Sequence, residues 1–133
     1  MDKTEEYIKQ CDCPEMQSDH VYTEGDVFYE KLVKPQPGGY QEGVFLEYDD
    51  FTWGSHAGDE TYPREKLIWL PRQDKLQEMI ESECPLALFL KFYRWMDLTD
   101  IAGFDDSMEQ LWLAFVMKEK YNKVWDGNEW RNS

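Results

Sequence analysis

Three residues near the start of the chain carry side chains that bind soft metal ions. Cys11 and Cys13 are one residue apart, and His20 follows seven residues later. Thiolate and imidazole groups are preferred zinc ligands, but the usual two- to four-residue spacer between the cysteines is missing. No second cysteine pair follows, so Cys84 or His56 would have to complete the ligand set. We therefore predict free thiols, no bound metal and no cofactor, with Cys11, Cys13 and His20 as weak metal candidates.

A second group with chemical potential lies in the segment 49–63. His56 is followed by Asp59 and Glu60, and a histidine beside carboxylates can act as a general base. Such a trio arises readily by chance in an acidic chain, and no nucleophile accompanies it. The sequence has no Gly-x-Ser-x-Gly, Walker-type or paired-glycine phosphate motif. We predict that the protein is not an enzyme; a small metal-binding protein or enzyme that uses Cys and His residues is an alternative.

The charge of the chain is strongly acidic and unevenly distributed. The net charge is −14, and residues 1–60 carry fifteen acids and four bases while residues 61–133 carry thirteen acids and ten bases. Such a chain repels nucleic-acid phosphates and attracts basic proteins. The plainer interpretation is a solvated surface that keeps the protein soluble. The sharper one is an acidic face that competes with nucleic acid for a basic protein.

We predict a partner-binding surface from acids that can imitate phosphate spacing and from residue types that anchor interfaces, Trp and Arg. For Arg72 the structural alternative is a pair with a nearby carboxylate, and Asp74 suits the first turn of a helix. The predicted partner-binding residues are Asp49, Asp50, Trp53, Asp59, Glu60, Trp69 and Arg72.

The elements that must position these residues change in character along the chain. We expect residues 1–23 to form a partly mobile segment with a short helical turn at 4–10. Runs rich in β-branched and aromatic residues predict strands at 25–33, 43–48 and 65–70. Residues 34–39, which are rich in Pro and Gly, are predicted to interrupt regular secondary structure. Apolar spacing predicts helices at 72–81, 85–96 and 107–121, and Asp-Gly predicts a tight turn within 123–130.

The helix at 107–121 is expected to be central and buried. Ser107 and Gln110 have the spacing of a capping box, and every residue from Leu111 to Met117 is apolar. Six aromatic residues of the C-terminal half are expected in the core or in an aromatic patch for homodimerisation or partner binding. They are Trp95, Trp112, Phe115, Tyr121, Trp125 and Trp130.

The predicted fold class is α+β, with a small antiparallel sheet in the N-terminal half packed against about three C-terminal helices. We predict one domain over residues 1–133, with a β-rich part at 24–71 and a helical part at 72–133. A small open barrel beside a three-helix bundle is the alternative. No apolar run approaches the roughly 18 residues of a membrane span, and no secretory signal is present. With three cysteines, an odd number, this predicts a cytoplasmic protein without membrane contact.

Two blocks of the sequence resemble small uncharacterised proteins encoded by phages and prophages of Gram-positive bacteria. They are residues 67–79 (LIWLPRQDKLQEM) and residues 107–127, which begin SMEQLWLAFVM; the early Cys-Asp-Cys is also similar. The resemblance implies a mobile-element origin and a bacterial cytosol, and no activity. We therefore expect a non-enzymatic acidic accessory protein that binds a basic protein partner. The alternative is a structural or assembly protein that forms oligomers through an aromatic surface.

Overall fold

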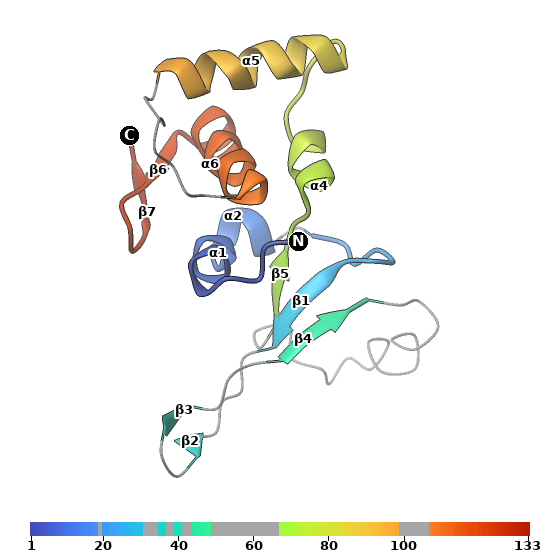
Figure 1. The fold of residues 1–133 in the computed structure, drawn as a ribbon, viewed down its shortest axis with the longest axis vertical. Coiled ribbons are helices and arrows are strands. Elements are labelled where there is room, and N and C mark those ends of the chain that lie inside the picture. The colour runs from blue at the N-terminus through green and yellow to red at the C-terminus, as the bar shows by residue number, and fades with distance from the viewer. Residues whose placement is uncertain (19, 31–34, 37–38, 41–43, 49–66, 99–106) are drawn as a thin grey trace. The chain divides into compact units, whose positions relative to one another are not determined.

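The computed structural model describes residues 1–18, 20–30, 35–36, 39–40, 44–48, 67–98 and 107–133 (Figure 1). The chain divides into two compact units, Lys3–Pro71 and Met1–Asp2 together with Arg72–Ser133. The predicted α+β class is confirmed, because a small antiparallel sheet lies in the N-terminal half and helices lie in the C-terminal half. The prediction of one domain over residues 1–133 stays a prediction.

The sheet of the first unit has three antiparallel strands in the order β4-β1-β5. They are β1 (Val27–Glu30), β4 (Val44–Glu47) and β5 (Leu67–Leu70), each inside a predicted strand range. Phe28 in the central strand lies opposite Leu46 on one side and Trp69 on the other. Every residue of β5 is at most 6% exposed. The short strands β2 (Pro35–Gln36) and β3 (Gly39–Tyr40) pair with each other within and beside the range 34–39, which the sequence predicts to interrupt secondary structure.

The N-terminal segment forms two helices, α1 (Glu5–Cys11) and α2 (Pro14–Gln17), which both contact β5 (Figure 1). Thr4 caps α1, because its side-chain oxygen accepts from the Tyr7 N–H at 3.2 Å. Tyr7, Cys11 and Met16 are at most 1% exposed, and the Tyr7 hydroxyl donates to the Pro71 carbonyl at 2.5 Å. The predicted helical turn is confirmed, and the predicted partial mobility of residues 1–23 stays a prediction.

Gln17 pairs with the backbone of β5, an edge strand of the sheet. Its side-chain oxygen accepts from the Trp69 N–H at 2.9 Å, and its side-chain nitrogen donates to the Trp69 carbonyl at 3.0 Å. The same nitrogen donates to the Cys11 carbonyl at 2.8 Å. One amide side chain thus gives β5 the pair of hydrogen bonds that a further strand would give, and protects an edge that would otherwise pair with another chain.

In the second unit, helix α6 (Met108–Tyr121) is the element on which the others pack. The helices α4 (Gln73–Glu78) and α5 (Pro85–Leu98) both contact it, and so does strand β6 (Lys123–Trp125) (Figure 1). Five α6 side chains are fully buried, which confirms the prediction of a central buried helix. They are Trp112, Leu113, Phe115, Val116 and Met117.

The beginning of α6 is capped by side chains that satisfy one another. The Ser107 hydroxyl accepts from the Gln110 N–H at 3.1 Å, which is the first of the two bonds of the predicted capping box. The second bond, from the Ser107 N–H to the Gln110 side chain, is replaced by a contact of that side chain with Asp2. The Asp2 carboxylate accepts from the Ser107 hydroxyl at 2.5 Å and from the Gln110 side-chain nitrogen at 2.7 Å. A carboxylate in this position also suits the positive end of the helix dipole. Met1 and Asp2 are therefore part of the second unit.

The end of α6 leads directly into the predicted C-terminal hairpin. Asn122 takes a left-handed conformation (φ 55°) and ends the helix. Strand β6 then pairs with β7 (Trp130–Asn132) across a turn in which one Asp126 oxygen accepts from the N–H groups of Asn128 and Glu129, each at 2.8 Å. These bonds lower the pKa of the Asp126 carboxyl. Gly127 has φ 104°, which explains a glycine in this turn.

Gln17→Glu tests the pairing of the sheet edge. The substitution replaces the donating nitrogen with a second oxygen, which faces the carbonyls of Cys11 and Trp69. We expect the free energy of unfolding to fall by about 2 kcal/mol, measured by urea unfolding. Gln77→Glu on α4 is the matched control, because it adds the same charge to a half-buried glutamine. Equal loss in the two variants would contradict the pairing role.

Candidate functional site

Two predicted site residues, His20 and Trp69, meet in the first unit. The two rings stack with their centroids 3.4 Å apart and their planes at 7°. Nε2 of His20 lies 2.6 Å from Oδ2 of Asp26, which is 1% exposed. The same carboxylate oxygen accepts from the Thr23 N–H at 2.8 Å, and the Asp26 N–H donates to the Thr23 carbonyl at 3.0 Å. His20 is thereby fixed against the edge strand, with one ring nitrogen engaged by a carboxylate.

This geometry does not favour a metal site at Cys11, Cys13 and His20. The nitrogen of His20 that contacts Asp26 is not available to a metal ion, and Cys11 is fully buried. The Cys13 thiol donates to the Gln10 carbonyl at 3.6 Å, and burial is the main cause that raises its pKa to about 12. Metals bind the thiolate form, which such a pKa disfavours. Among the described residues no three His, Cys, Asp or Glu side chains gather in a group that would hold a metal ion.

Most of the predicted acidic surface lies outside the described residues. This holds for Asp49, Asp50, Trp53, Asp59 and Glu60, and also for His56. Their role in binding a partner stays a prediction.

The two remaining predicted partner-binding residues have different surroundings. Trp69 is 4% exposed and stacks on His20, so the proposed presentation of its ring to a partner does not fit the structure. The reason is that β5, although it is an edge strand, is covered by its own unit. Arg72 precedes α4, and its Nε lies 3.4 Å from a carboxylate oxygen of Asp74 in the first turn. This is the structural alternative that the sequence suggests for Arg72.

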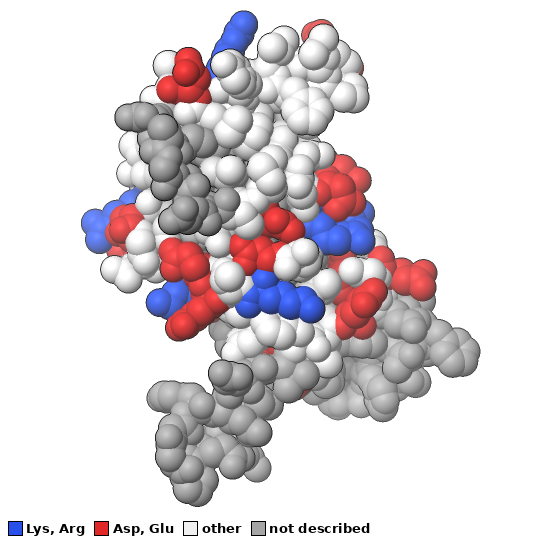
Figure 2. All heavy atoms as spheres, in the orientation of Figure 1, with Lys and Arg blue, Asp and Glu red and all other residues white. Residues whose placement is uncertain are grey.

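Acidic side chains dominate the exposed charges of the described surface. Figure 2 shows them interspersed with fewer basic groups, with much of the surface over α5 uncharged in this view. The exposed acids on described helices and strands include Glu5, Glu47, Asp74, Glu78, Asp97 and Glu119.

The aromatic patch that the sequence suggests is located differently in the structure. Trp112 and Phe115 are fully buried, while Trp95, Tyr121, Trp125 and Trp130 are half-buried. The exposed apolar side chains are on α5 instead. Leu86 is 67% exposed, Phe89 56%, Leu90 49% and Tyr93 64%. We call these four residues the α5 face.

The α5 face is not identified by sequence reasoning, because α5 is apolar on nearly all sides. Periodicity therefore cannot distinguish a buried face from an exposed one. The α5 face does have the spacing i, i+3, i+4, i+7 of one side of a helix, but Leu88, Phe92 and Trp95 have a similar spacing, so the sequence does not select between the two sides.

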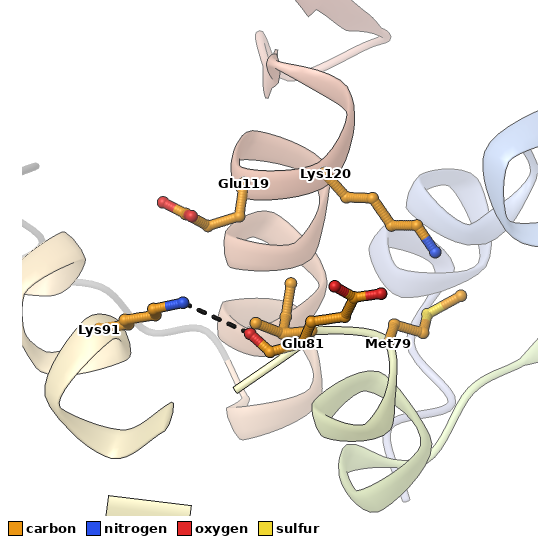
Figure 3. Close-up of a pocket in the computed structure, with 6 residues that line it drawn as sticks. Met79, Glu81, Lys91, Glu119 and Lys120 are labelled. Carbon is orange, nitrogen blue, oxygen red and sulfur yellow. Dashed lines mark hydrogen bonds between the residues drawn. The ribbon is translucent and has the colours of Figure 1, made fainter. Parts of the chain in front are cut away.

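A shallow pocket of about 340 Å³ is lined by the residues that follow α4, by α5 and by α6 (Figure 3). Two acids and two bases surround an apolar floor, and the Lys91 ammonium donates to the Glu81 carbonyl at 3.4 Å. The balanced charges give no strong preference for an anionic or a cationic ligand. None of the described lining residues is a Ser, Cys or His. The residues that line the pocket are Met79, Ile80, Glu81, Lys91, Glu119 and Lys120.

Comparison of the chain with protein-family models, with curated proteins and with solved structures finds no match. Within the described ranges, no helix combines the length and the apolar character that crossing a bilayer requires. The site therefore has to be judged from its own chemistry. That chemistry is an acidic surface, an exposed apolar helix face, and buried polar groups engaged in the fold.

The thiols provide a direct test of the environment of Cys13. At pH 8 a pKa of about 12 leaves roughly one Cys13 in ten thousand as the reactive thiolate. We expect iodoacetamide to alkylate the exposed Cys84 at least 100-fold faster than Cys13, measured by peptide mass spectrometry. In 8 M urea the two rates should converge, which is the control. Rapid alkylation of Cys13 in the folded protein would contradict the burial described here.

Proposed function

We propose that the protein is a non-enzymatic accessory protein of a mobile element, which acts in the cytosol through its acidic surface on a basic protein partner. The observation that carries this proposal is the net charge of −14, of which residues 1–60 contribute −11. A charge of this size gives the protein a long-range attraction for basic surfaces and speeds encounter with them.

The chemistry of the partner follows from the charge. Proteins that handle nucleic acid expose Lys and Arg arranged to neutralise phosphates. Carboxylates at comparable spacing can occupy the same positions, so the protein would act as a decoy for nucleic acid. Asp49, Asp50, Asp59 and Glu60 are the proposed contacts, because they form two acidic pairs within a short stretch that also contains Trp53.

The cellular setting rests on two supports. The resemblance of residues 67–79 and 107–127 to phage and prophage proteins favours a mobile element of a Gram-positive bacterium. The cysteines also favour a reducing compartment, since none of Cys11, Cys13 and Cys84 is in a disulfide.

The alternative of a metal protein or enzyme has less support from the geometry. His20 contacts Asp26 and stacks on Trp69, and burial raises the pKa of Cys13, so two of the three candidate ligands are poorly disposed toward a metal. The buried polar side chains around β5 instead stabilise the sheet and its adjoining turn.

Capture from bacterial lysate at low salt, repeated at about 0.5 M salt, tests the proposal. The Debye length at the higher salt is only about 4 Å, so a contact driven by charge should weaken steeply. We expect mass spectrometry to identify a basic nucleic-acid-binding protein that is captured at low salt and released at high salt. Nucleic acid added in excess should displace it.

A matched pair of variants locates the contact. The first neutralises the proposed surface with Asp49→Asn, Asp50→Asn, Asp59→Asn and Glu60→Gln. The second neutralises four exposed acids elsewhere with Glu47→Gln, Glu78→Gln, Glu119→Gln and Glu129→Gln, so both have the same net charge. Loss of capture in the first variant only is expected. Equal loss in both would show that net charge matters and the proposed residues do not, and salt-resistant capture would overturn the decoy mechanism.

A further inference from the structure

The α5 face is an exposed apolar surface on a helix that is firmly attached to its own unit. On the side of α5 that packs on α6, Phe92 is 4% exposed and its ring stacks on Trp112 with centroids 3.9 Å apart and planes at 7°. Phe89, at the edge of the α5 face, also contacts Trp112 edge to face, with centroids 6.5 Å apart. Phe92 also contacts Phe115 edge to face, with centroids 5.4 Å apart. The rotation of α5 about its own axis is therefore fixed by packing on α6, and the α5 face is held outward as a preformed surface.

We propose that the α5 face binds the α5 face of a second copy of the chain, with the two helices antiparallel. A two-fold symmetric contact must be self-complementary. The spacing of Leu86, Phe89, Leu90 and Tyr93 meets this condition, since it is the same when read in either direction. An antiparallel pair centred between Phe89 and Leu90 places Leu86 of each copy against Tyr93 of the other, and Phe89 against Leu90.

The charges beside the α5 face are complementary in this arrangement. Glu83 lies just before α5, whereas Arg94 lies near its end, and both side chains are exposed. In the centred antiparallel pair, Arg94 of one copy lies opposite Pro85 of the other. Glu83 of the other copy is two residues before Pro85, just outside the helix, and is the acid nearest in sequence to that position. Arg94 also precedes Asp97 of its own helix by three residues, so one guanidinium can serve two carboxylates.

A second copy fits the α5 face better than the other candidate occupants. Within α5 the charged residues are Lys91, Arg94 and Asp97, a net charge of +1 in a chain of −14. A basic protein is attracted to the acidic surface elsewhere and not to this helix. Helices that lie in membrane interfaces carry several Lys or Arg on their polar side, whereas the bases of α5 are Lys91 and Arg94.

Sedimentation equilibrium of the full chain tests the proposal. We expect a monomer–dimer equilibrium up to about 0.5 mM protein, a range in which even a weak dimer is populated. The dimer should persist at about 0.5 M salt, because apolar contacts are not screened. A protein that remains monomeric throughout, or that forms open-ended assemblies, overturns the proposal.

Phe89 and Leu90 are 56% and 49% exposed, and Phe89 also contacts the Trp112 ring, so the folding of the variant is checked separately from its association. We expect Phe89→Ser with Leu90→Ser to raise the dissociation constant of the dimer at least tenfold. Val124→Ser on β6 is the control, since Val124 is 44% exposed in the same unit, and it should change the constant less than twofold. Circular dichroism verifies that both variants are folded. Equal effects of the two variants would overturn the assignment of the interface.

A charge exchange tests the antiparallel arrangement independently of the apolar contacts. Arg94→Glu and Glu83→Arg should each raise the dissociation constant roughly three- to tenfold, because symmetry makes the contact twice. The double variant should restore it to within twofold of the wild type. If the double variant is as weak as the single ones, the two residues do not meet and the arrangement is wrong.

The membrane alternative is resolved by flotation with vesicles of phosphatidylcholine alone and of phosphatidylcholine mixed with phosphatidylglycerol. We expect no binding to either. Flotation of the wild type but not of the Phe89→Ser, Leu90→Ser variant would assign the face to a bilayer and overturn self-association. This inference is independent of the acidic contact proposed above, since dimerisation resists salt and capture of a basic partner does not.

Discussion

The stack of Phe92 on Trp112 is the contact on which the exposed surface of the second unit depends. Trp112 is fully buried in α6, and its parallel, closely spaced contact with Phe92 is one of the two closest aromatic contacts among the described residues. The burial of two large rings stabilises the fold by several kcal/mol, and a rearrangement of exposed side chains would not offset its loss. Because Phe92 is fixed inward, Leu86, Leu90 and Tyr93, which lie about 100° or more from it around the helix axis, face solvent.

Two polar side chains of the first unit, the half-buried Gln17 and the buried Asp26, bind parts of the fold. Gln17 completes the hydrogen bonds of β5 at Trp69, and Asp26 holds both His20 and the turn that begins at Thr23. Burying such groups is unfavourable unless they are paired, so their presence is explained by the edge and the turn that they stabilise. Two features of the described residues are open to contact with other molecules, namely the exposed acidic side chains and the α5 face.

The sequence predicts the elements of this fold better than it predicts their exposed faces. The cap at Ser107 and the apolar run from Leu111 to Met117 are local signals, and α6 follows them closely. The strands β1, β4 and β5 likewise lie where β-branched and aromatic residues cluster. For α5 the sequence signal is ambiguous, because its residues are apolar on nearly all sides. Only the contact of Phe92 with α6 determines which side of the helix is buried.

The missed contacts join residues that have no characteristic spacing in the sequence. Gln17 and Trp69 are 52 positions apart, and His20 and Asp26 are six apart in a segment without periodicity. Trp69 is a typical interface residue by type, yet its strand is covered within its own unit. The burial of a residue on an edge strand depends on what else packs there, and this is a tertiary property that residue type alone does not reveal.

Hydroxyl-radical footprinting of the full chain, read by peptide mass spectrometry, tests the orientation of α5 most directly. Phe89, Phe92 and Tyr93 are all reactive aromatic residues within one helical turn, so they differ mainly in exposure. In dilute protein the account predicts oxidation of Phe89 and Tyr93 and protection of Phe92 and Trp112, with Tyr93 becoming protected as the concentration rises. Oxidation of Phe92 as readily as Tyr93, or protection of Tyr93 at every dilution, would contradict it.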